Sequence, residues 1–276
     1  MSGEGPGRLG RREMLGLMAA GALARGASAA PFALHATMID HVEFWVSDVG
    51  NSTTFYSRVF GRTVLKNNKT PRRYVKLGPS FVAMDRGPQI RVDHFCAGIS
   101  DFQIAAAHRY LEERGLTYKD YPSGRDLYVV DPDGIHVQLS GESSWNQLLA
   151  GTASPETPPG GEPVFQALGL DHILLHVTDP EKSAAFYEQI FGPVAQRNNN
   201  RTWFRAGRSR IGLLRTPAGG RAGVDHFCVA AAPFDYDAAA KKLAEAGAKI
   251  EKPEIAGAPE FRDPDGYLVQ VMAQRA

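Results

Sequence analysis

The stretch that decides the fold is Asp131-Pro132-Asp133-Gly134-Ile135-His136-Val137-Gln138. Asp, Pro and Gly at its first, second and fourth positions are typical of a type I β-turn. The β-forming residues after the turn alternate, so His136 and Gln138 are expected to share one face of a strand. The stretch returns near the C-terminus as Asp263-Pro264-Asp265-Gly266-Tyr267-Leu268-Val269-Gln270, again with a Gln four residues after the Gly.

Three further motifs recur at nearly the same spacing. Four landmarks at one spacing indicate an internal duplication of about 105 residues, too long for a solenoid unit and typical of a compact domain. We therefore expect two copies of one domain, named repeat one (38–142) and repeat two (167–276), joined by a linker at 143–166. The recurring motifs are Asp40-His41 with Asp171-His172, Asp93-His94-Phe95-Cys96 with Asp225-His226-Phe227-Cys228, and Phe55-Tyr56…Phe60-Gly61 with Phe186-Tyr187…Phe191-Gly192.

These motifs resemble the vicinal oxygen chelate superfamily, which includes glyoxalase I, bleomycin-resistance proteins, extradiol dioxygenases and methylmalonyl-CoA epimerase. The resemblance rests on the Asp-His opening strand, the Phe-Tyr-x-x-x-Phe-Gly helix end, the Asp-His-Phe strand and the Asp-Pro-Asp-Gly closing strand of both repeats. It implies an α+β fold of two tandem domains, each a pair of βαβββ modules that curl into a cup around a divalent metal. The ligands are then expected from the first strand of each module and from a fourth strand.

The composition is that of an ordinary soluble globular protein. The chain has 276 residues, of which 43% are hydrophobic and 22% are charged, so it has room for two cores. A formal net charge of +1 gives no argument for binding nucleic acid or an anionic membrane surface. No apolar run approaches the roughly 18 residues of a membrane helix, so no membrane span is expected.

The N-terminal segment 1–37 is interpreted as a signal peptide and tether. An Arg11-Arg12 pair precedes the apolar stretch Leu15–Leu23, and Ala27-Ser28-Ala29 offers a small-x-small cleavage site. This order resembles a twin-arginine export signal, a route for proteins that fold, often with a cofactor, before they cross the membrane. We therefore expect a periplasmic or extracellular protein; the alternative is a disordered basic tail with a chance Arg pair.

Local signals predict the elements of repeat one. A strand is expected at 38–46, and a helix from Ser52 as its N-cap to Phe60, with Gly61 as its stop. The remaining expected elements are strands near 73–77 and 81–85 and a helix at about 102–114.

Repeat two is expected to repeat this plan. Thr178 and Glu181 predict a capping box, with Pro180 in the first helical turn. Between the repeats, the Pro- and Gly-rich segment 157–163 cannot sustain a helix or a central strand, so 143–166 is interpreted as an exposed linker.

The resemblance also implies one set of metal ligands in each repeat. These residues stand where extradiol dioxygenases carry His, His and Glu, but the third residue here is a Gln, which can still bind a metal through its carbonyl oxygen. A neutral oxygen forfeits the attraction of a carboxylate, about 4 kcal/mol for unit charges roughly 4 Å apart at an effective dielectric near 20. The expected ion is Fe, Mn or Zn. The expected ligands are His41, His94 and Gln138 in repeat one and His172, His226 and Gln270 in repeat two.

Repeat one has the richer polar set and is the expected catalytic half. Glu43 lies on the ligand face of the first strand and can supply the missing charge; a salt bridge at the rim is the alternative for this residue. Tyr128 resembles a tyrosine that hydrogen-bonds the bound diol in extradiol enzymes, and His136 lies on the ligand face of the closing strand. Tyr128 and His136 are therefore the candidate catalytic residues. The corresponding residues of repeat two are Leu174, Glu260 and Leu268.

The two cysteines occupy equivalent positions in the repeats. Cys96 and Cys228 are expected to belong to separate cups, further apart than the roughly 7 Å between Cα atoms that a disulfide allows. Two buried thiols are the expected state, and a soft ligand beside each His is the alternative.

Two functions remain in view. The first is an exported metalloenzyme in which a divalent ion holds two vicinal oxygens of a small substrate, for dioxygenase, isomerase or lyase chemistry. The alternative is a non-catalytic protein of bleomycin-resistance type that binds a small ligand without metal. A small molecule is the expected partner, and the repeats are expected to form an intramolecular pseudo-dimer within a monomer, or to assemble into a homodimer.

Overall fold

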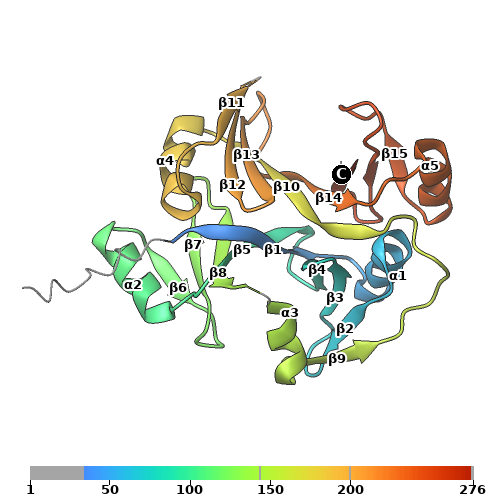
Figure 1. Ribbon diagram of the computed structural model, residues 1–276, viewed down its shortest axis with the longest axis horizontal. Helices are drawn as coiled ribbons and strands as arrows, with labels where there is room; N and C mark the ends of the chain where they lie inside the picture. Colours follow the sequence, from blue (N-terminus) through green and yellow to red (C-terminus); the bar gives the residue numbers. More distant parts are fainter. Residues whose placement is uncertain (1–33, 143, 199, 275–276) are drawn as a thin grey trace, which may run out of the picture. The chain divides into compact units, whose positions relative to one another are not determined.

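The computed structural model describes residues 34–142, 144–198 and 200–274, and in each repeat these residues form one mixed β-sheet (Figure 1). This confirms the expected α+β fold. The strands of the first sheet and the helices between them are, in chain order, β1 (Ala36–Trp45), α1 (Val49–Phe60), β2 (Val64–Asn67), β3 (Arg73–Leu77), β4 (Ser80–Asp85), β5 (Arg91–Ile99), α2 (Ile104–Glu113), β6 (Tyr118–Asp120), β7 (Leu127–Val130), β8 (His136–Gly141), α3 (Ser144–Gln147), the π-helical turn η1 (Leu148–Thr152) and β9 (Ala153–Glu156). Those of the second are β10 (Ala167–Val177), α4 (Pro180–Phe191), β11 (Gln196–Asn198), β12 (Arg201–Ala206), β13 (Ser209–Arg215), β14 (Gly223–Ala231), α5 (Tyr236–Glu245), β15 (Lys249–Glu251), β16 (Glu260–Arg262) and β17 (Leu268–Ala273).

Each sheet contains two βαβββ modules. In repeat one, β1 pairs parallel with β4, β5 pairs parallel with β8, and β1 pairs antiparallel with β5. Repeat two has the same pattern around β10 and β14. The strand orders are β6-β7-β8-β5-β1-β4-β3-β2-β9 and β11-β12-β13-β10-β14-β17-β16-β15. The opening strands of the two modules therefore lie side by side within each sheet.

A β-bulge interrupts the central strand pair at every Asp-His motif. The pairing register shifts by one residue at each Asp, which is left as the extra residue of its strand. A regular strand turns successive side chains to opposite faces, whereas a bulge breaks this alternation and re-aims a side chain. The Asp and the His of one motif are thereby brought into contact. The bulged residues are Asp40, Asp93, Asp171 and Asp225.

The duplicated turn and helix motifs form contacts between the two repeats. The hydroxyl of Tyr56 on α1 donates to Asp263 Oδ2 in the closing turn of repeat two, at 2.9 Å. The matching pair is Tyr187 on α4, which donates to Asp131 Oδ2 at 3.0 Å. Burial raises the pKa of Asp263 to about 6 and also raises the pKa of Asp131. Two of the motifs that reveal the duplication are thus the surfaces by which the copies bind each other.

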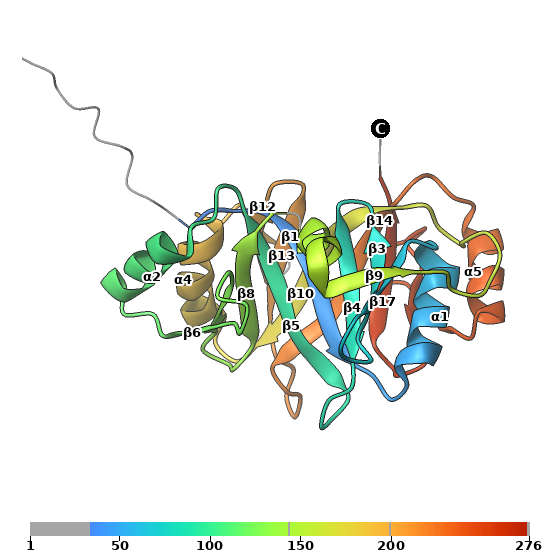
Figure 2. The same cartoon turned by 90° about the horizontal axis from the view of Figure 1, so that it is seen from below.

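Buried apolar side chains of both repeats form one core. Helix α1 lies beside α5 and α2 lies beside α4 in both views (Figures 1 and 2). Within the shared core, rings of the two repeats also meet: the centroids of Phe55 on α1 and Phe261 on β16 are 6.1 Å apart, and those of Phe44 on β1 and Phe227 on β14 are 6.0 Å apart. Because the core is shared, each repeat depends on the other to bury part of its apolar surface.

The expected linker at 143–166 is a connector only in its second half. Residues 144–156 form α3, η1 and β9, and β9 pairs with β2 at the edge of the first sheet. The prediction was wrong for these residues because Trp145 packs on Phe81, with ring centroids 5.6 Å apart, in a small second core. Residues 157–166 run without helix or strand, as their Pro and Gly content predicts.

The expected helix N-caps were wrong in both repeats. Asp48, rather than Ser52, caps α1, and Asp179, rather than Thr178, caps α4, so the capping box does not form. Thr178 instead donates its backbone N–H to Asp133 Oδ2 at 3.0 Å, across the contact between repeats. Asp, Ser and Thr are all good N-caps, and the residue type alone does not decide which of them precedes the first turn.

The expected signal peptide and its cleavage site lie outside the described residues. Among the helices of the described ranges, none is long and apolar enough to cross a membrane.

Candidate metal centre

One imidazole pair lies on the opening strands of each repeat. The Nε2 atoms of His41 and His94 are 3.3 Å apart in repeat one, and those of His172 and His226 are 3.1 Å apart in repeat two. All four side chains are buried. The structure thus brings together the two histidines that the resemblance pairs in each repeat.

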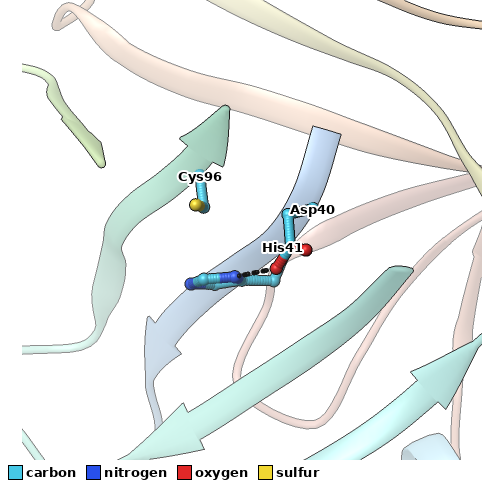
Figure 3. Close-up of side chains that lie close together, drawn as sticks. All are labelled: Asp40, His41 and Cys96. Carbon is cyan, nitrogen blue, oxygen red and sulfur yellow. Dashed lines mark hydrogen bonds and ion pairs between the residues drawn. The ribbon is translucent and has the colours of Figure 1, made fainter. Parts of the chain in front are cut away.

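An Asp binds the outer nitrogen of each imidazole. The Nδ1–Oδ distances are 2.8 Å for Asp40 and His41, 2.9 Å for Asp93 and His94, 2.6 Å for Asp171 and His172, and 2.7 Å for Asp225 and His226. Figure 3 shows the contact at His41. Because an aspartate carboxylate only accepts hydrogen bonds, the proton of each neutral ring sits on Nδ1 and a lone pair remains on Nε2.

Three of these carboxylates are favoured in their charged form. Burial opposes the ionisation of Asp93, Asp171 and Asp225, but the bond from the adjacent imidazole and nearby positive charge hold the pKa of each below its usual value. Arg210 contributes this charge at Asp171, with Nη2 2.7 Å from Oδ1. Burial also lowers the pKa of His172, so its ring is neutral at neutral pH.

The facing imidazoles leave a position for a cation beside their Nε2 atoms. Two nitrogen lone pairs that point at each other at about 3 Å repel unless a proton or a metal ion lies between them. The lowered pKa of His172 disfavours the proton in repeat two. Metal-bound histidines nearly always donate their other ring N–H to a carboxylate or carbonyl group, which is the arrangement at all four rings. The donor chemistry therefore fits a divalent metal.

Gln270 on β17 supplies a third donor in repeat two. Its Nε2 donates to Glu260 Oε1 on the neighbouring strand β16, at 2.8 Å. Because a carboxylate cannot donate, the amide nitrogen must face Glu260, which fixes the orientation of the carbonyl oxygen. That oxygen is buried and has no hydrogen-bond partner among the described residues, a costly state for an acceptor. Gln270 lines a cavity of about 200 Å³ together with His172 and His226.

Gln138 of repeat one lacks this support. Tyr128 lies opposite it on β7, where repeat two has Glu260. Within the described part of the chain, no hydrogen bond fixes the Gln138 amide. Gln138 and His41 line a cavity of about 170 Å³.

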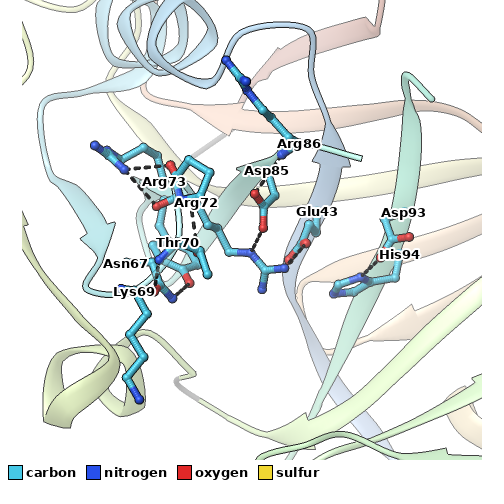
Figure 4. A network of polar contacts seen from close by, with 12 residues as sticks. Glu43, Asn67, Lys69, Thr70, Arg72, Arg73, Asp85, Arg86, Asp93 and His94 are labelled. Carbon is cyan, nitrogen blue, oxygen red and sulfur yellow. Dashed lines mark hydrogen bonds and ion pairs between the residues drawn. The ribbon is translucent and has the colours of Figure 1, made fainter. Parts of the chain in front are cut away.

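Glu43 borders the imidazole pair of repeat one but is already paired. Its Oε1 lies 2.8 Å from Arg72 Nη2, and its side chain is only 4% exposed, so the salt bridge is buried rather than at the rim. Arg72 also donates to Asp85 Oδ2 at 2.9 Å (Figure 4). Ligand atoms of Glu43, Asp93 and His94 lie within 4.8 Å of one another. The charge of Glu43 is therefore close to the imidazoles, and a guanidinium balances it.

The two candidate catalytic residues are placed differently around His94. Tyr128 contacts the ring of His94 edge-on, with centroids 5.3 Å apart, and burial raises its pKa, so its phenol keeps its proton at neutral pH. His136 lines a cavity between the repeats, which also touches His94, and does not line the cavity of His41 and Gln138.

Cys96 and Cys228 are buried free thiols, which confirms the simpler expectation. Burial raises the pKa of each thiol well above its usual value, so neither is a thiolate at neutral pH. The sulfur of Cys96 lies within 4.8 Å of ligand atoms of Asp40 and His41 (Figure 3), and Cys228 has the same position in repeat two. A protonated thiol is a weak ligand, so the imidazoles remain the better donors.

Each cup also contains an arginine that was not among the residues expected from the sequence. Arg72 and Arg201 stand at matching positions, two residues before Tyr74 and Trp203 respectively, and each lines the cavity of its repeat. Arg201 donates to Glu254 Oε2 at 2.8 Å. The repeated Arg-x-aromatic spacing was the available signal.

The sequence is similar to those of known proteins. Residues 169–271 match the family model described as the Glyoxalase/Bleomycin resistance protein/Dioxygenase superfamily. The chain is 24% identical over 236 residues to a lactoylglutathione lyase of Schizosaccharomyces pombe, with 72% of each chain covered. It is 25% identical over 187 residues to a catechol-2,3-dioxygenase of Bacillus subtilis, covering 56% of this chain and 65% of that protein.

Solved structures share the fold at low identity. The 2,3-dioxygenase LapB from Pseudomonas sp. KL28 superimposes with a TM-score of 0.67 at 15% identity, covering 88% of this chain and 94% of that one. The Mn(II)-bound glyoxalase from Novosphingobium aromaticivorans gives a TM-score of 0.64 at 16% identity, covering 87% and 82%.

Proposed function

Because residues 169–271 match the model of the Glyoxalase/Bleomycin resistance protein/Dioxygenase superfamily, we propose that repeat two is the metal-binding half of a divalent-metal-dependent enzyme. The proposed ligands are His172, His226 and Gln270, and the proposed substrate is a small molecule with two vicinal oxygens. Fe(II), Mn(II) and Zn(II) are the candidate ions, since imidazole and carbonyl donors suit all three. This choice of repeat is the opposite of the preference drawn from sequence.

The buried, unpartnered carbonyl oxygen of Gln270 carries the proposal. A buried acceptor left unpaired destabilises the fold by about 1–3 kcal/mol, and a cation beside the imidazole pair would remove that cost. Repeat one offers no equivalent, because its Glu43 is neutralised by Arg72 and its Gln138 amide is not held. The match of repeat two to the family model supports the same choice.

The chain's own residues have distinct parts in this function. His172 and His226 would hold the ion, and their Nδ1 bonds to Asp171 and Asp225 leave a lone pair on each Nε2. A divalent ion bound there would hold two substrate oxygens and stabilise the anion that forms on them.

Arg201 lines the same cavity and would attract a negatively charged substrate. It can be recruited because its partner, Glu254, is 51% exposed and loses little when the pair opens.

Calorimetric titration of the metal-free full chain with Mn(II), Fe(II) and Zn(II) tests the proposal. We expect one ion per chain, and Gln270→Ala should weaken binding by about tenfold or more. Gln138→Ala is the matched control from repeat one and should bind as the unmodified chain does. Equal losses in the two variants would contradict the choice of repeat two, and no binding of any ion would favour the non-catalytic ligand-binding function.

We also propose that the protein is exported. The Arg11-Arg12 pair and the small-x-small site at Ala27-Ser28-Ala29 support this. Replacing both arginines with Lys should leave unprocessed protein in the cytoplasm. Cell fractionation measures where the Lys variant accumulates and whether it is trimmed. Export and trimming equal to those of the unmodified chain would argue against the twin-arginine route.

A further inference from the structure

A second kind of cavity lies between the two repeats and is not used by the proposed function. It has a volume of about 450 Å³ and is lined by the start of β5, the closing turn of repeat one, the end of β10 and the start of β14. This size is within the range of about 300–1,000 Å³ that is usual for small-molecule sites. Its position on residues of both repeats means that neither repeat forms it alone.

The cavity collects basic side chains from both repeats. Arg91 and His136 come from repeat one, and His176 and Arg221 come from repeat two. Arg221 and His136 make no side-chain hydrogen bond within the described residues. The Nε of Arg91 is buried without a hydrogen-bond partner in the same part of the chain. These groups therefore have donor capacity that the protein does not use.

The carboxylates that line the cavity are already occupied. Asp93 accepts from Arg91 Nη2 at 3.1 Å through one oxygen and pairs with His94 Nδ1 at 2.9 Å through the other. Asp133 accepts from the backbone N–H of Thr178 at 3.0 Å and from its hydroxyl. Among the described residues, neither acid is hydrogen-bonded to Arg221, His136 or His176.

The cavity is also connected to both imidazole pairs through single aspartates. Arg91 binds Asp93, which binds His94 of repeat one. His176 Nδ1 lies 3.5 Å from Asp225 Oδ1, and the other oxygen of Asp225 binds His226 of repeat two. An anion bound to Arg91 and His176 would therefore adjoin the residues that hold an imidazole in each cup.

The geometry points to a binding site for a small organic anion that carries two carboxylate groups. Unused donors from both repeats match an anion with charge at both ends, and the volume exceeds what a single oxyanion needs. Charge-assisted hydrogen bonds from guanidinium groups are the strongest contacts such a ligand can make here. The duplication does not repeat the two histidines of this cavity, because the positions that match His136 and His176 hold Leu268 and Trp45.

Titration of the metal-free full chain with succinate and with acetate at constant ionic strength tests this site independently of any metal. We expect saturable binding of one succinate per chain and at least about tenfold weaker binding of acetate, which carries one carboxylate. Arg221→Gln should weaken succinate binding about tenfold, and since Arg221 is exposed, the fold should not depend on it. His136→Leu, which introduces the residue type that repeat two has at position 268, should also weaken binding.

The control is Arg205→Gln, which removes the same charge from an exposed position on β12 outside the cavity and should bind succinate normally. No saturable succinate binding up to about 10 mM would overturn the proposal, since weaker affinity is typical of non-specific attraction. Equal affinities for acetate and succinate, or an undiminished affinity in Arg221→Gln, would overturn it as well.

Discussion

Repeat one and repeat two hold the same four-residue frame, two aspartates and two histidines on bulged strands, but surround it differently. In repeat two, Glu260 turns the carbonyl oxygen of Gln270 away from itself and leaves it unpaired. In repeat one, the residue opposite the Gln is Tyr128, and the polar contacts concentrate on the buried ion pair of Glu43 and Arg72. The duplication thus preserves the imidazole geometry, while single neighbours decide whether a third donor is oriented.

The imidazole pairs give the largest expected difference between the repeats. Mn(II) should raise the unfolding temperature of the metal-free chain, because an ion that binds only the folded state stabilises it. His226→Ala should abolish this gain, since it removes one of three donors, whereas His94→Ala should retain it. Scanning calorimetry with and without Mn(II) measures both. If the gain disappeared in both variants or in neither, the two cups would not differ as metal sites.

The ion pair of repeat one gives the next effect, on stability rather than on metal binding. Arg72→Met leaves Glu43 buried and uncompensated, which should lower the free energy of unfolding by about 3 kcal/mol. Arg201→Met is the matched change in repeat two and should cost less than about 1 kcal/mol, because Glu254 is half exposed. Urea denaturation of both variants measures the difference. Similar losses would mean that Arg72 is not the special feature of its cup.

The fold was predictable because its signals are local and occur twice. The modules can be recognised from the Asp-His strands, from the helices that stop at Gly61 and Gly192 and from the two closing turns. The duplication indicates that both repeats have the same plan of modules. The two facing histidines of each repeat followed from the same motifs. The linker prediction failed at 144–156 because the burial of Trp145 depends on a distant residue, Phe81, which no local pattern reveals.

The second layer of the site was not predictable in the same way. Alternation along a regular strand assigns Asp40 and His41 to opposite faces, so the contact between them appears only once the pairing register shows a bulge. Glu260 and Gln270 are ten residues apart and meet because β16 and β17 pair antiparallel. The preference for repeat one came from counting polar residues, and that count contains neither the partners of Glu43 nor the orientation of an amide.

Glu260 sharpens the comparison, with a smaller effect on metal affinity. Glu260→Leu should weaken metal binding about tenfold, because the Gln270 amide is then free to turn its nitrogen inward. Glu260→Gln should recover part of the affinity, since its carbonyl oxygen can still accept from Gln270 Nε2. Tyr128→Leu, at the equivalent place in repeat one, should leave affinity unchanged. Isothermal titration with Mn(II) ranks the variants. An affinity in Glu260→Leu equal to that of the unmodified chain would mean that Glu260 does not position the amide.

The last comparison concerns the contacts that join the repeats, and it is measured as a dependence of stability on pH. Burial raises the pKa of Asp263 to about 6, against about 3.9 in an unfolded chain, so the folded protein binds the proton more tightly. Stability from this group is therefore fully present below its unfolded pKa and is lost as pH rises through about 6.

Asp263→Asn should accordingly flatten the rise in stability of the chain on acidification from about pH 7 to about pH 4, while Asn still accepts the backbone bonds of the turn. Asp131→Asn tests the matching contact and should act in the same direction, because burial raises the pKa of Asp131 too. Asp237→Asn, an exposed change on α5, is the control and should leave the slope of stability against pH in place. Urea denaturation at several pH values compares the slopes. A slope in Asp263→Asn identical to that of the unmodified chain would show that this carboxyl does not couple protonation to folding. A change of slope in only one of the two Asn variants would mean that the contacts between the repeats are asymmetric, as the cups are.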